Sequence, residues 1–157
     1  MILVYILITL VTFVIMEGVT WLTHKYVMHG FLWSWHEDHH QPRYNGIFEK
    51  NDRFGLVFST ISISLFLSST LLGAPWYLFI GLGILLYGIA YFLVHDIFIH
   101  QRTKWFRNSN HWYFRALRKA HKVHHKHLGK EEGECFGMLF VPIKYFKEAM
   151  ATTKKAA

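Results

Sequence analysis

The sequence predicts an all-α integral membrane protein, a helical bundle of about three spanning helices with a cytoplasmic histidine-rich helical cap. Three observations predict this class: three long apolar segments with almost no charge, lysines and arginines confined to two stretches, and histidines gathered where apolar segments end. The 157 residues, 52% of them hydrophobic, fit a single domain, 1–157. A soluble domain of this length is too small to enclose three such helices.

The three apolar segments are residues 2–23, 54–72 and 75–94. The first contains one charged residue, Glu17, and the other two contain none. Each is close to the roughly 20 residues that cross the hydrocarbon core of a bilayer. The first segment has neither the basic start nor the small-residue cleavage site of a signal peptide, so we expect a retained membrane helix.

The basic residues indicate how these helices are oriented. All 17 lysines and arginines lie within 25–53 or 102–155, and the positive-inside rule places such stretches in the cytoplasm. The Gly-Ala-Pro segment at 73–75 joins the second and third spans and is too short for anything but a hairpin. We therefore expect the N-terminus outside, and cytoplasmic parts at 24–53 and 95–157.

The second cytoplasmic part contains two further expected elements. Residues 108–128 predict a basic, aromatic helix with its N-cap among 108–110 and Gly129 as its stop. Residues 136–149 are apolar but too short to span, and Pro142 interrupts them, which favours an interfacial segment. We expect the basic charge to meet lipid headgroups, and no nucleic-acid-binding signature is visible.

Ten of the twelve histidines form two sets with the same spacing, an HxxxxH followed by an HxxHH. The members are His24, His29, His36, His39 and His40 in the first set and His95, His100, His121, His124 and His125 in the second. Imidazole suits zinc, copper, iron and nickel, and no role is expected for the single cysteine, Cys135. A structural zinc site normally has four ligands, so ten histidines predict two metal ions. His111 and His127 lie outside the pattern and are expected outside the site.

The spacing within each set constrains how the rings can point. In HxxHH the residues are at i, i+3 and i+4, so all three rings are expected on one helix face as a facial ligand set. In HxxxxH the two residues are about 140° apart on a straight helix. Such a pair can serve one metal only where the helix ends or bends, and otherwise serves two metals. Its position at the membrane exits favours an end or a bend.

Carboxylates are the candidate partners for the outer nitrogen of a ligating imidazole. Glu17 lies seven residues before His24, on nearly the same helix face, and an ionisable residue inside a span is a functional candidate. The alternative is a snorkelling or protonated side chain. The same partner role, or simple solvation, is open to three others: Glu37, Asp38 and Asp96. No catalytic residue beyond the metal ligands is expected.

Three segments resemble the histidine boxes of the bacterial β-carotene 3-hydroxylases, which belong to the fatty acid hydroxylase superfamily of membrane diiron enzymes. They are HKYVMHGFLWSWHEDHHQP (24–42), HDIFIHQR (95–102) and AHKVHH (120–125). The resemblance covers nearly the whole chain, and its most specific part is VMHGFLWSWHEDHH followed by Gln-Pro. It implies hydroxylation of β-carotene at C3 of the β-ionone rings, to cryptoxanthin and zeaxanthin. It further implies two iron ions, O2, and electrons from a separate protein of the ferredoxin type.

That chemistry is compatible with the residues. An unactivated ring C–H needs a strong oxidant, which zinc cannot provide, although zinc can replace iron in a purified sample. The substrate is an apolar polyene about as long as a membrane is thick, so a site at the mouth of the bundle can take one ring while the remainder stays in lipid. Aromatic residues that could line this route, or pack at the interface instead, are Trp21, Phe31, Trp33, Trp35, Tyr91, Phe92 and Phe98.

Two other functions remain open from the sequence. A fatty acyl or sterol hydroxylase or desaturase would use the same boxes. A histidine-rich membrane metal transporter belongs to a different class and would place its ligands near the bilayer midplane, whereas the predicted spans contain no histidine. The ending Lys154-Lys155-Ala156-Ala157 resembles an endoplasmic-reticulum retrieval signal. We nevertheless expect a bacterial inner membrane, with the histidines on its cytoplasmic side.

Overall fold

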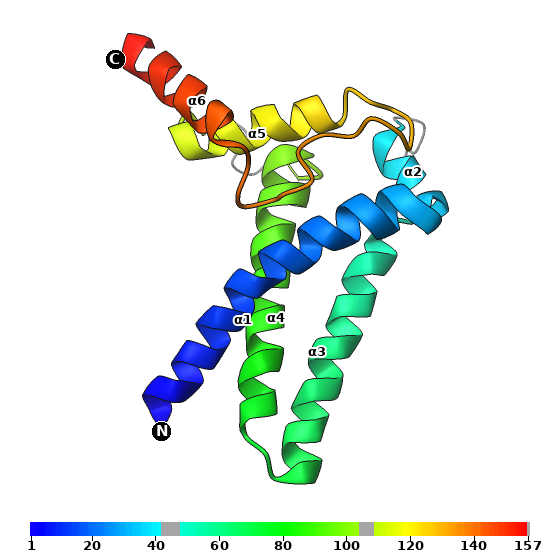
Figure 1. Ribbon diagram of the computed structural model, residues 1–157, viewed down its shortest axis with the longest axis vertical. Coiled ribbons are helices and arrows are strands. Elements are labelled where there is room, and N and C mark those ends of the chain that lie inside the picture. Colours follow the sequence, from blue (N-terminus) through cyan, green and yellow to red (C-terminus); the bar gives the residue numbers. More distant parts are fainter. Residues whose placement is uncertain (42–47, 104–108, 157) are drawn as a thin grey trace.

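The computed structural model describes residues 1–41, 48–103 and 109–156, and within these ranges it contains helices and no strand (Figure 1). In chain order the elements are α1 (Ile2–Leu22), η1 (Thr23–Phe31), α2 (Trp33–His40), α3 (Asp52–Leu72), α4 (Trp76–Tyr91), η2 (Phe92–Ile99), α5 (Trp112–His124) and α6 (Ile143–Ala156). The elements η1 and η2 are π-helices, which have wider turns than an α-helix. The all-α class is confirmed.

Three helices are long and apolar enough to cross a membrane: Ile2–Phe31, Asp52–Leu72 and Trp76–Ile99. They confirm the three predicted spans and lengthen two of them, because α1 continues into η1 and α4 into η2. Three histidines predicted just beyond the spans therefore lie inside these continuous helices: His24, His29 and His95. At most 22% of the residues in each apolar window are buried, as expected for helices that face lipid.

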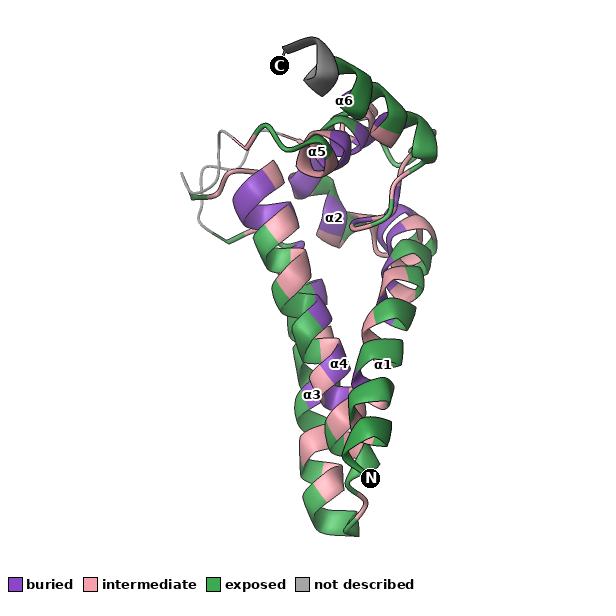
Figure 2. Ribbon diagram, turned by 90° about the vertical axis from the view of Figure 1, so that its left-hand side faces the viewer, coloured by how far each residue is buried: buried purple, intermediate pink, exposed green. Residues whose placement is uncertain are grey.

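The two ends of the bundle have different contents. The N-terminus and the turn at 73–75 lie at one end, while α2, α5 and α6 lie at the other (Figure 1). Gly73 adopts φ +63°, a left-handed conformation that ends α3 and permits the tight hairpin. Buried residues concentrate at the opposite end, in η1, α2, η2 and α5 (Figure 2). The side of the membrane on which each end lies stays a prediction.

The helix α4 packs against both α1 and α3. Gly83 allows the approach to α1, since a Cβ there would lie 2.6 Å from the Thr12 Cβ and 2.8 Å from the Thr9 carbonyl oxygen. Toward α3, the Ser62 hydroxyl donates to the Gly81 carbonyl oxygen at 2.8 Å. Small residues and interhelical hydrogen bonds of this kind hold helices together in lipid, where apolar burial supplies no driving force between them.

The cap is formed by α5 and α6, and its boundaries correct the predicted ones. The helix α5 begins at Trp112 rather than near 108–110, because His111 is its N-cap and accepts the Tyr113 N–H at 3.4 Å. Of the predicted caps, Asn108 lies outside the described residues. The helix ends at His124, before Gly129, because the backbone beyond it supplies carbonyl groups to histidine rings.

The segment 136–149 divides at Pro142, as the sequence indicated. The helix α6 begins at Ile143, directly after this proline, a residue well suited to helix starts. Residues 134–137 before it have no regular secondary structure. The α5–α6 contact buries four residues: Ala116, Ala120, Tyr145 and Ala149. An interfacial location for this segment stays a prediction.

Candidate metal centre

Nine of the ten clustered histidines gather into two groups within which the candidate ligand atoms lie within 4.8 Å of one another. The first histidine group consists of His24, His29, His36, His40 and His124. The second histidine group consists of His39, His95, His100 and His121. All are buried except His100, which is half-buried. The two sets found in the sequence are thus brought together at one end of the bundle.

The π-helices explain how each HxxxxH pair serves a single group. In a π-helix the N–H of residue i+5 bonds to the carbonyl of residue i, so residues five apart lie one turn above each other. The His100 N–H donates to the His95 carbonyl oxygen in this way, at 2.8 Å. His24 and His29 lie within η1. The bend expected from the spacing is therefore a widened turn that aligns both rings.

Each HxxHH box divides its rings between the two groups, which corrects the predicted facial set. In α2, His36 and His40 belong to the first group and His39 to the second. On an α-helix, residues i and i+4 are about 40° apart, whereas i+3 and i+4 are about 100° apart, so the i+3 ring reaches the neighbouring group. In α5 the assignment is crossed, with His121 in the second group and His124 in the first.

This crossed pattern relates the two halves of the chain and places the tenth histidine. Each set gives its HxxxxH pair to one group and its i+3 ring, His39 or His124, to the other. His125 is the i+4 partner of His121, and its ring lies 4.5 Å from the His121 ring and 4.8 Å from the His100 ring. Among the described residues its Nε2 is buried without a hydrogen-bond partner. The His125 ring also stacks on the His40 ring of the first group at 4.3 Å, so His125 lies between the two groups.

Oxygen acceptors set the proton positions in the first group. Each Nδ1 donates to an oxygen: His24 to the Phe136 carbonyl (3.1 Å), His29 to that of Lys130 (3.1 Å), His40 to that of His127 (3.1 Å), His124 to that of Glu134 (2.7 Å), and His36 to the Asn51 side chain (2.7 Å). Every Nε2 is left as an acceptor. The Nε2 atoms of His24 and His36 lie 3.1 Å apart. Lone pairs this close repel unless a cation lies between them, so the donor set fits a metal ion.

Carboxylates lie on the outer side of two rings of the second group, and one of them is hydrogen-bonded to its ring. The His39 Nδ1 donates to Glu49 Oε2 at 2.7 Å, and the His95 Nδ1 lies 3.5 Å from Asp96 Oδ1. Arg102 holds both acids, with nitrogens 2.8 Å from Glu49 Oε2 and 3.1 Å from Asp96 Oδ1. The inward Nε2 atoms of His39 and His95 lie 3.0 Å apart, which again suits a cation.

Three of these partners were not predicted: Glu49, Asn51 and Arg102. A signal existed, because Glu49 and Asn51 lie just before a span and Arg102 follows His100 by two residues. These positions did not indicate which histidine each residue would contact, because Glu49 and Asn51 are 10 or more residues away in sequence from the rings that they bind. The backbone carbonyls between 127 and 136 carry no side-chain signal at all.

Two of the predicted carboxylate partners, Asp96 and Glu17, have different surroundings. Asp96 lies beside His95, as expected. Glu17 accepts the Tyr87 hydroxyl at 2.7 Å and the backbone N–H groups of 138–140. Glu17 therefore binds the backbone just after the carbonyl groups between 127 and 136, and it does not bind a histidine ring.

The other two carboxylates lie on the outer side of α2. Glu37 is exposed and accepts a hydrogen bond from the Gln41 side chain at 3.1 Å. Asp38 accepts the Lys50 N–H at 2.7 Å. The partner of each is thus a loop residue that fixes the end of α2.

Burial keeps four of the clustered histidines outside the membrane spans neutral. Desolvation lowers the pKa of His40 and of His100 to about 4 in each case. It lowers the pKa of His124 to about 3 and that of His125 to about 2, with further lowering by neighbouring imidazoles. At neutral pH these rings are therefore unprotonated, as metal ligation requires.

The aromatic residues predicted to line a substrate route occupy different environments. The Trp33 ring lies 5.2 Å from the His29 ring and the Tyr91 ring 4.7 Å from the His95 ring. Phe98 is buried. The other four positions are half-buried or exposed: Trp21, Phe31, Trp35 and Phe92. Two of the seven therefore adjoin ligand candidates.

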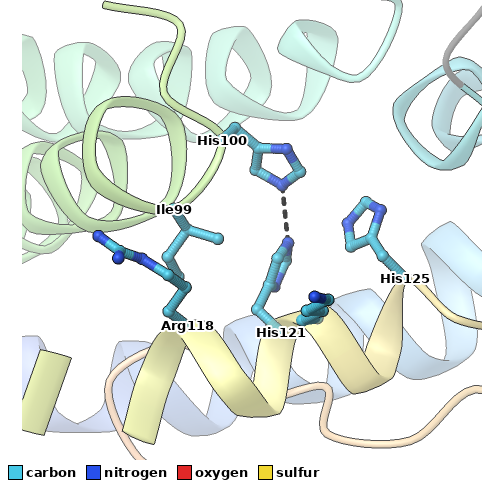
Figure 3. Close-up of a pocket in the computed structure, with 6 residues that line it drawn as sticks. Ile99, His100, Arg118, His121 and His125 are labelled. Carbon is cyan, nitrogen blue, oxygen red and sulfur yellow. Dashed lines mark hydrogen bonds between the residues drawn. The ribbon is translucent and has the colours of Figure 1, made fainter. Parts of the chain in front are cut away.

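A cavity of about 360 Å³ adjoins the second group (Figure 3). It is lined by Ile99, His100, Arg118, His121, Lys122 and His125. The rings of His100 and His121 meet across it from η2 and α5, with their Nε2 atoms 2.7 Å apart (Figure 3). Two residues of the second group, His100 and His121, thus line the cavity, and the sequence did not indicate its two basic residues.

Comparisons with known proteins show the family of this chain. The family model described as "Fatty acid hydroxylase" matches residues 9–146. A "Beta-carotene hydroxylase" of Pantoea ananas is 44% identical over 138 residues, covering 87% of this chain and 77% of the relative. One from Pseudescherichia vulneris is 42% identical over 135 residues, covering 85% and 75%. The chloroplastic "Beta-carotene 3-hydroxylase 2" of Arabidopsis thaliana is 37% identical over 124 residues, covering 76% and 39%. No solved structure matches.

Proposed function

The chain belongs to the fatty acid hydroxylase family, and from that premise we propose that it adds a hydroxyl group at C3 of the β-ionone rings of β-carotene. Its bacterial relatives support carotenoid hydroxylation. They do not favour the alternative of a fatty acyl or sterol hydroxylase or desaturase. The products would be cryptoxanthin and then zeaxanthin. The position C3 rests on the name of the plant relative.

The two histidine groups are proposed to hold two iron ions, five imidazoles to each, with His125 completing the second group. Two bound irons would supply O2 activation and the oxidising power that a ring C–H bond demands. One oxygen atom of O2 would be inserted into the C–H bond and the other would leave as water, which requires two electrons and two protons from outside the chain. The residues' own part is to keep neutral Nε2 atoms directed inward and to fix them through their Nδ1 partners.

The location of the centre suits a substrate dissolved in lipid. The ligands of η1 and η2 sit where two spanning helices end, so a ring can reach the centre while the polyene stays among the helices. Trp33 and Tyr91 beside the rings of His29 and His95 would exclude water from the ring's path. A transporter would place its ligands near the bilayer midplane, and this arrangement does not favour one.

The electron source is proposed to be a separate ferredoxin-type protein that approaches from the cytoplasmic side of a bacterial inner membrane. Its support is the one-sided distribution of the 17 lysines and arginines, which by the positive-inside rule puts the histidine end in the cytoplasm. The second group lies nearest to the open cavity, which makes it the shorter route for an incoming electron.

The observation that carries the proposal is the identity of 36–44% to bacterial carotene hydroxylases over 85–87% of the chain. The test is expression in a bacterium that accumulates β-carotene, followed by pigment analysis. We expect cryptoxanthin and zeaxanthin from the wild type and neither from His36→Ala at the same membrane level. Unchanged β-carotene with a wild-type protein that is inserted and loaded with iron would contradict the proposal.

A further inference from the structure

We propose that Glu17, on the first spanning helix, is a positioning residue for the first histidine group, acting through the backbone of residues 130–140. The inference rests on the proposed function in one respect, that the first group holds a metal ion. The hydrogen bonds of Glu17 go to Tyr87 and to the backbone of residues 138–140, and none of them goes to a histidine of the group. Its effect reaches the ligands through the chain segment that it holds.

The carboxylate of Glu17 receives an unusual set of donors. Its Oε1 accepts the N–H groups of Met138, Leu139 and Phe140 at 2.9, 3.0 and 2.9 Å, and its Oε2 accepts the Tyr87 hydroxyl at 2.7 Å. Hydrogen bonds to an ionised acceptor are about twice as strong as neutral ones. These bonds join α1 and α4 to a stretch that has no helix or strand of its own to fix it.

The chain just before this anchor supplies the acceptors of the first group. The carbonyls of Lys130, Glu134 and Phe136 receive the Nδ1–H groups of His29, His124 and His24. Three of the five rings in the first group therefore take their orientation from one irregular segment. If one of these carbonyl groups moves, the histidine ring that it holds can rotate, and the Nε2 atom of that ring no longer points toward the metal position.

The glycines of the segment show how closely it is fitted. A Cβ at Gly137 would collide with the Phe140 carbonyl oxygen and lie 3.3 Å from Glu17 Oε1. A Cβ at Gly133 would lie 2.9 Å from the Phe136 ring and 3.5 Å from the His29 ring. The backbone thus passes closely between Glu17 and the His29 ring, and this close packing can carry a displacement at Glu17 to the rings.

The second histidine group provides the internal control. The His39 Nδ1 donates to Glu49, and Asp96 lies 3.5 Å from the His95 Nδ1. Arg102 holds both acids, and among the described residues the segment 130–140 forms no hydrogen bond to these two rings. Removal of the Glu17 carboxylate should therefore weaken metal binding at the first group and leave the second group unchanged. A general loosening of the fold would weaken both.

The experiment measures Co²⁺ affinity of the purified full-length protein in two backgrounds, His95→Ala, which leaves the first group intact, and His36→Ala, which leaves the second. Adding Glu17→Ala should raise the Co²⁺ Kd about 10-fold in the first background and less than about twofold in the second. Glu17→Gln keeps one acceptor oxygen and should give an intermediate rise. Glu148→Gln makes the same chemical change on α6, where the carboxylate pairs with Lys119, and should change neither Kd.

Hydrogen exchange supplies a second readout that needs no metal. In metal-free Glu17→Ala the amides of 138–140 should exchange faster than in the wild type. Equal Kd values with and without Glu17→Ala, or an equal rise in both backgrounds, would overturn the inference. If Glu17→Ala does not insert, Glu17→Gln and Tyr87→Phe carry the same test with smaller shifts. A wild type that binds no Co²⁺ would overturn the proposed function as well, so the two failures are distinguishable.

Discussion

The two histidine groups use the same ligand but surround it differently. Around the first group the Nδ1 atoms donate to four backbone carbonyls and the amide oxygen of Asn51, all neutral. Around the second group the His39 Nδ1 donates to the carboxylate of Glu49, and Asp96 lies 3.5 Å from the His95 Nδ1. Both acids form ion pairs with Arg102. The two groups are therefore equivalent in sequence pattern and different in electrostatics.

This difference predicts unequal metal sites. A carboxylate that accepts the outer N–H of an imidazole makes the ring a more basic ligand than a carbonyl does. The second group should therefore bind a cation more tightly and favour its more oxidised state, and it also adjoins the cavity. Predictions that break or sharpen this comparison follow, from the largest expected effect to the smallest.

Removal of a single ligand should have the largest effect and the same outcome in both groups. We expect His36→Ala and His95→Ala each to lower hydroxylation more than about 100-fold, beyond the usual cost of losing an outer partner, because both ions are needed. The same holds for the other eight clustered histidines. The measurement is zeaxanthin formation in cells at matched membrane levels.

The variants should still insert, because helices satisfy their own backbone hydrogen bonds in lipid. The control is His127→Ala, whose side chain is 34% exposed and whose backbone carbonyl, used by His40, is retained. It should keep most activity. Full activity in several of the ligand variants would contradict the assignment of these histidines as metal ligands.

Removal of an outer partner should separate the groups. Glu49→Gln replaces a carboxylate 2.7 Å from His39 Nδ1 and should lower the affinity of the second group about 10-fold. Asn51→Ala removes the acceptor 2.7 Å from His36 Nδ1 and should act only on the first group. Titration of each variant with Co²⁺ measures the two affinities. Equal effects of both substitutions on both ions would show that the groups are not independent.

Acid tests what the groups share. The pKa values of His40 and His100 are about 4 when folded, against about 6.5 unfolded. As pH falls below 6.5, His40 and His100 become protonated in the unfolded chain but stay neutral in the folded one. The free energy of unfolding therefore decreases between about pH 6.5 and 4. The Tm of the metal-free protein in detergent should fall steadily across that range. A Tm that is constant from pH 7 to 4 would contradict the burial of neutral rings.

A gain of charge at the first group should give the smallest effect. Asn51 is buried, and Asn51→Asp would place a carboxylate on His36 Nδ1 and so imitate the second group. We expect the Co²⁺ affinity of the first group to rise by less than about 10-fold. A fall in affinity would show that burying the added charge outweighs the gain in ligand basicity.

Much of this arrangement could be predicted from the sequence. Segments of spanning length with at most one charged residue predicted the three membrane helices, and the repeated histidine spacing predicted two groups. Those features are local, since apolar runs and ligand spacings act within one helix. Asp96 beside His95 is local in the same sense.

The remainder depends on contacts between distant segments. The π-helical turn that aligns His95 with His100 has no distinct residue signature. No signature indicates either that His39 and His124 lie in the group opposite to that of their own HxxxxH pair. Glu17 was predicted as a partner of a ligating imidazole, whereas it accepts the Tyr87 hydroxyl and backbone N–H groups more than 120 residues away. Pairings of that kind are decided by packing and not by a motif.

The most direct test of the account is an anomalous-scattering map of the crystalline protein prepared with iron. We predict two peaks, one among the Nε2 atoms of the first histidine group and one among those of the second, with His125 within bonding distance of the second peak. A single peak, or a peak bound by fewer than three of these histidines, would contradict the claim that the paired sets build two metal sites.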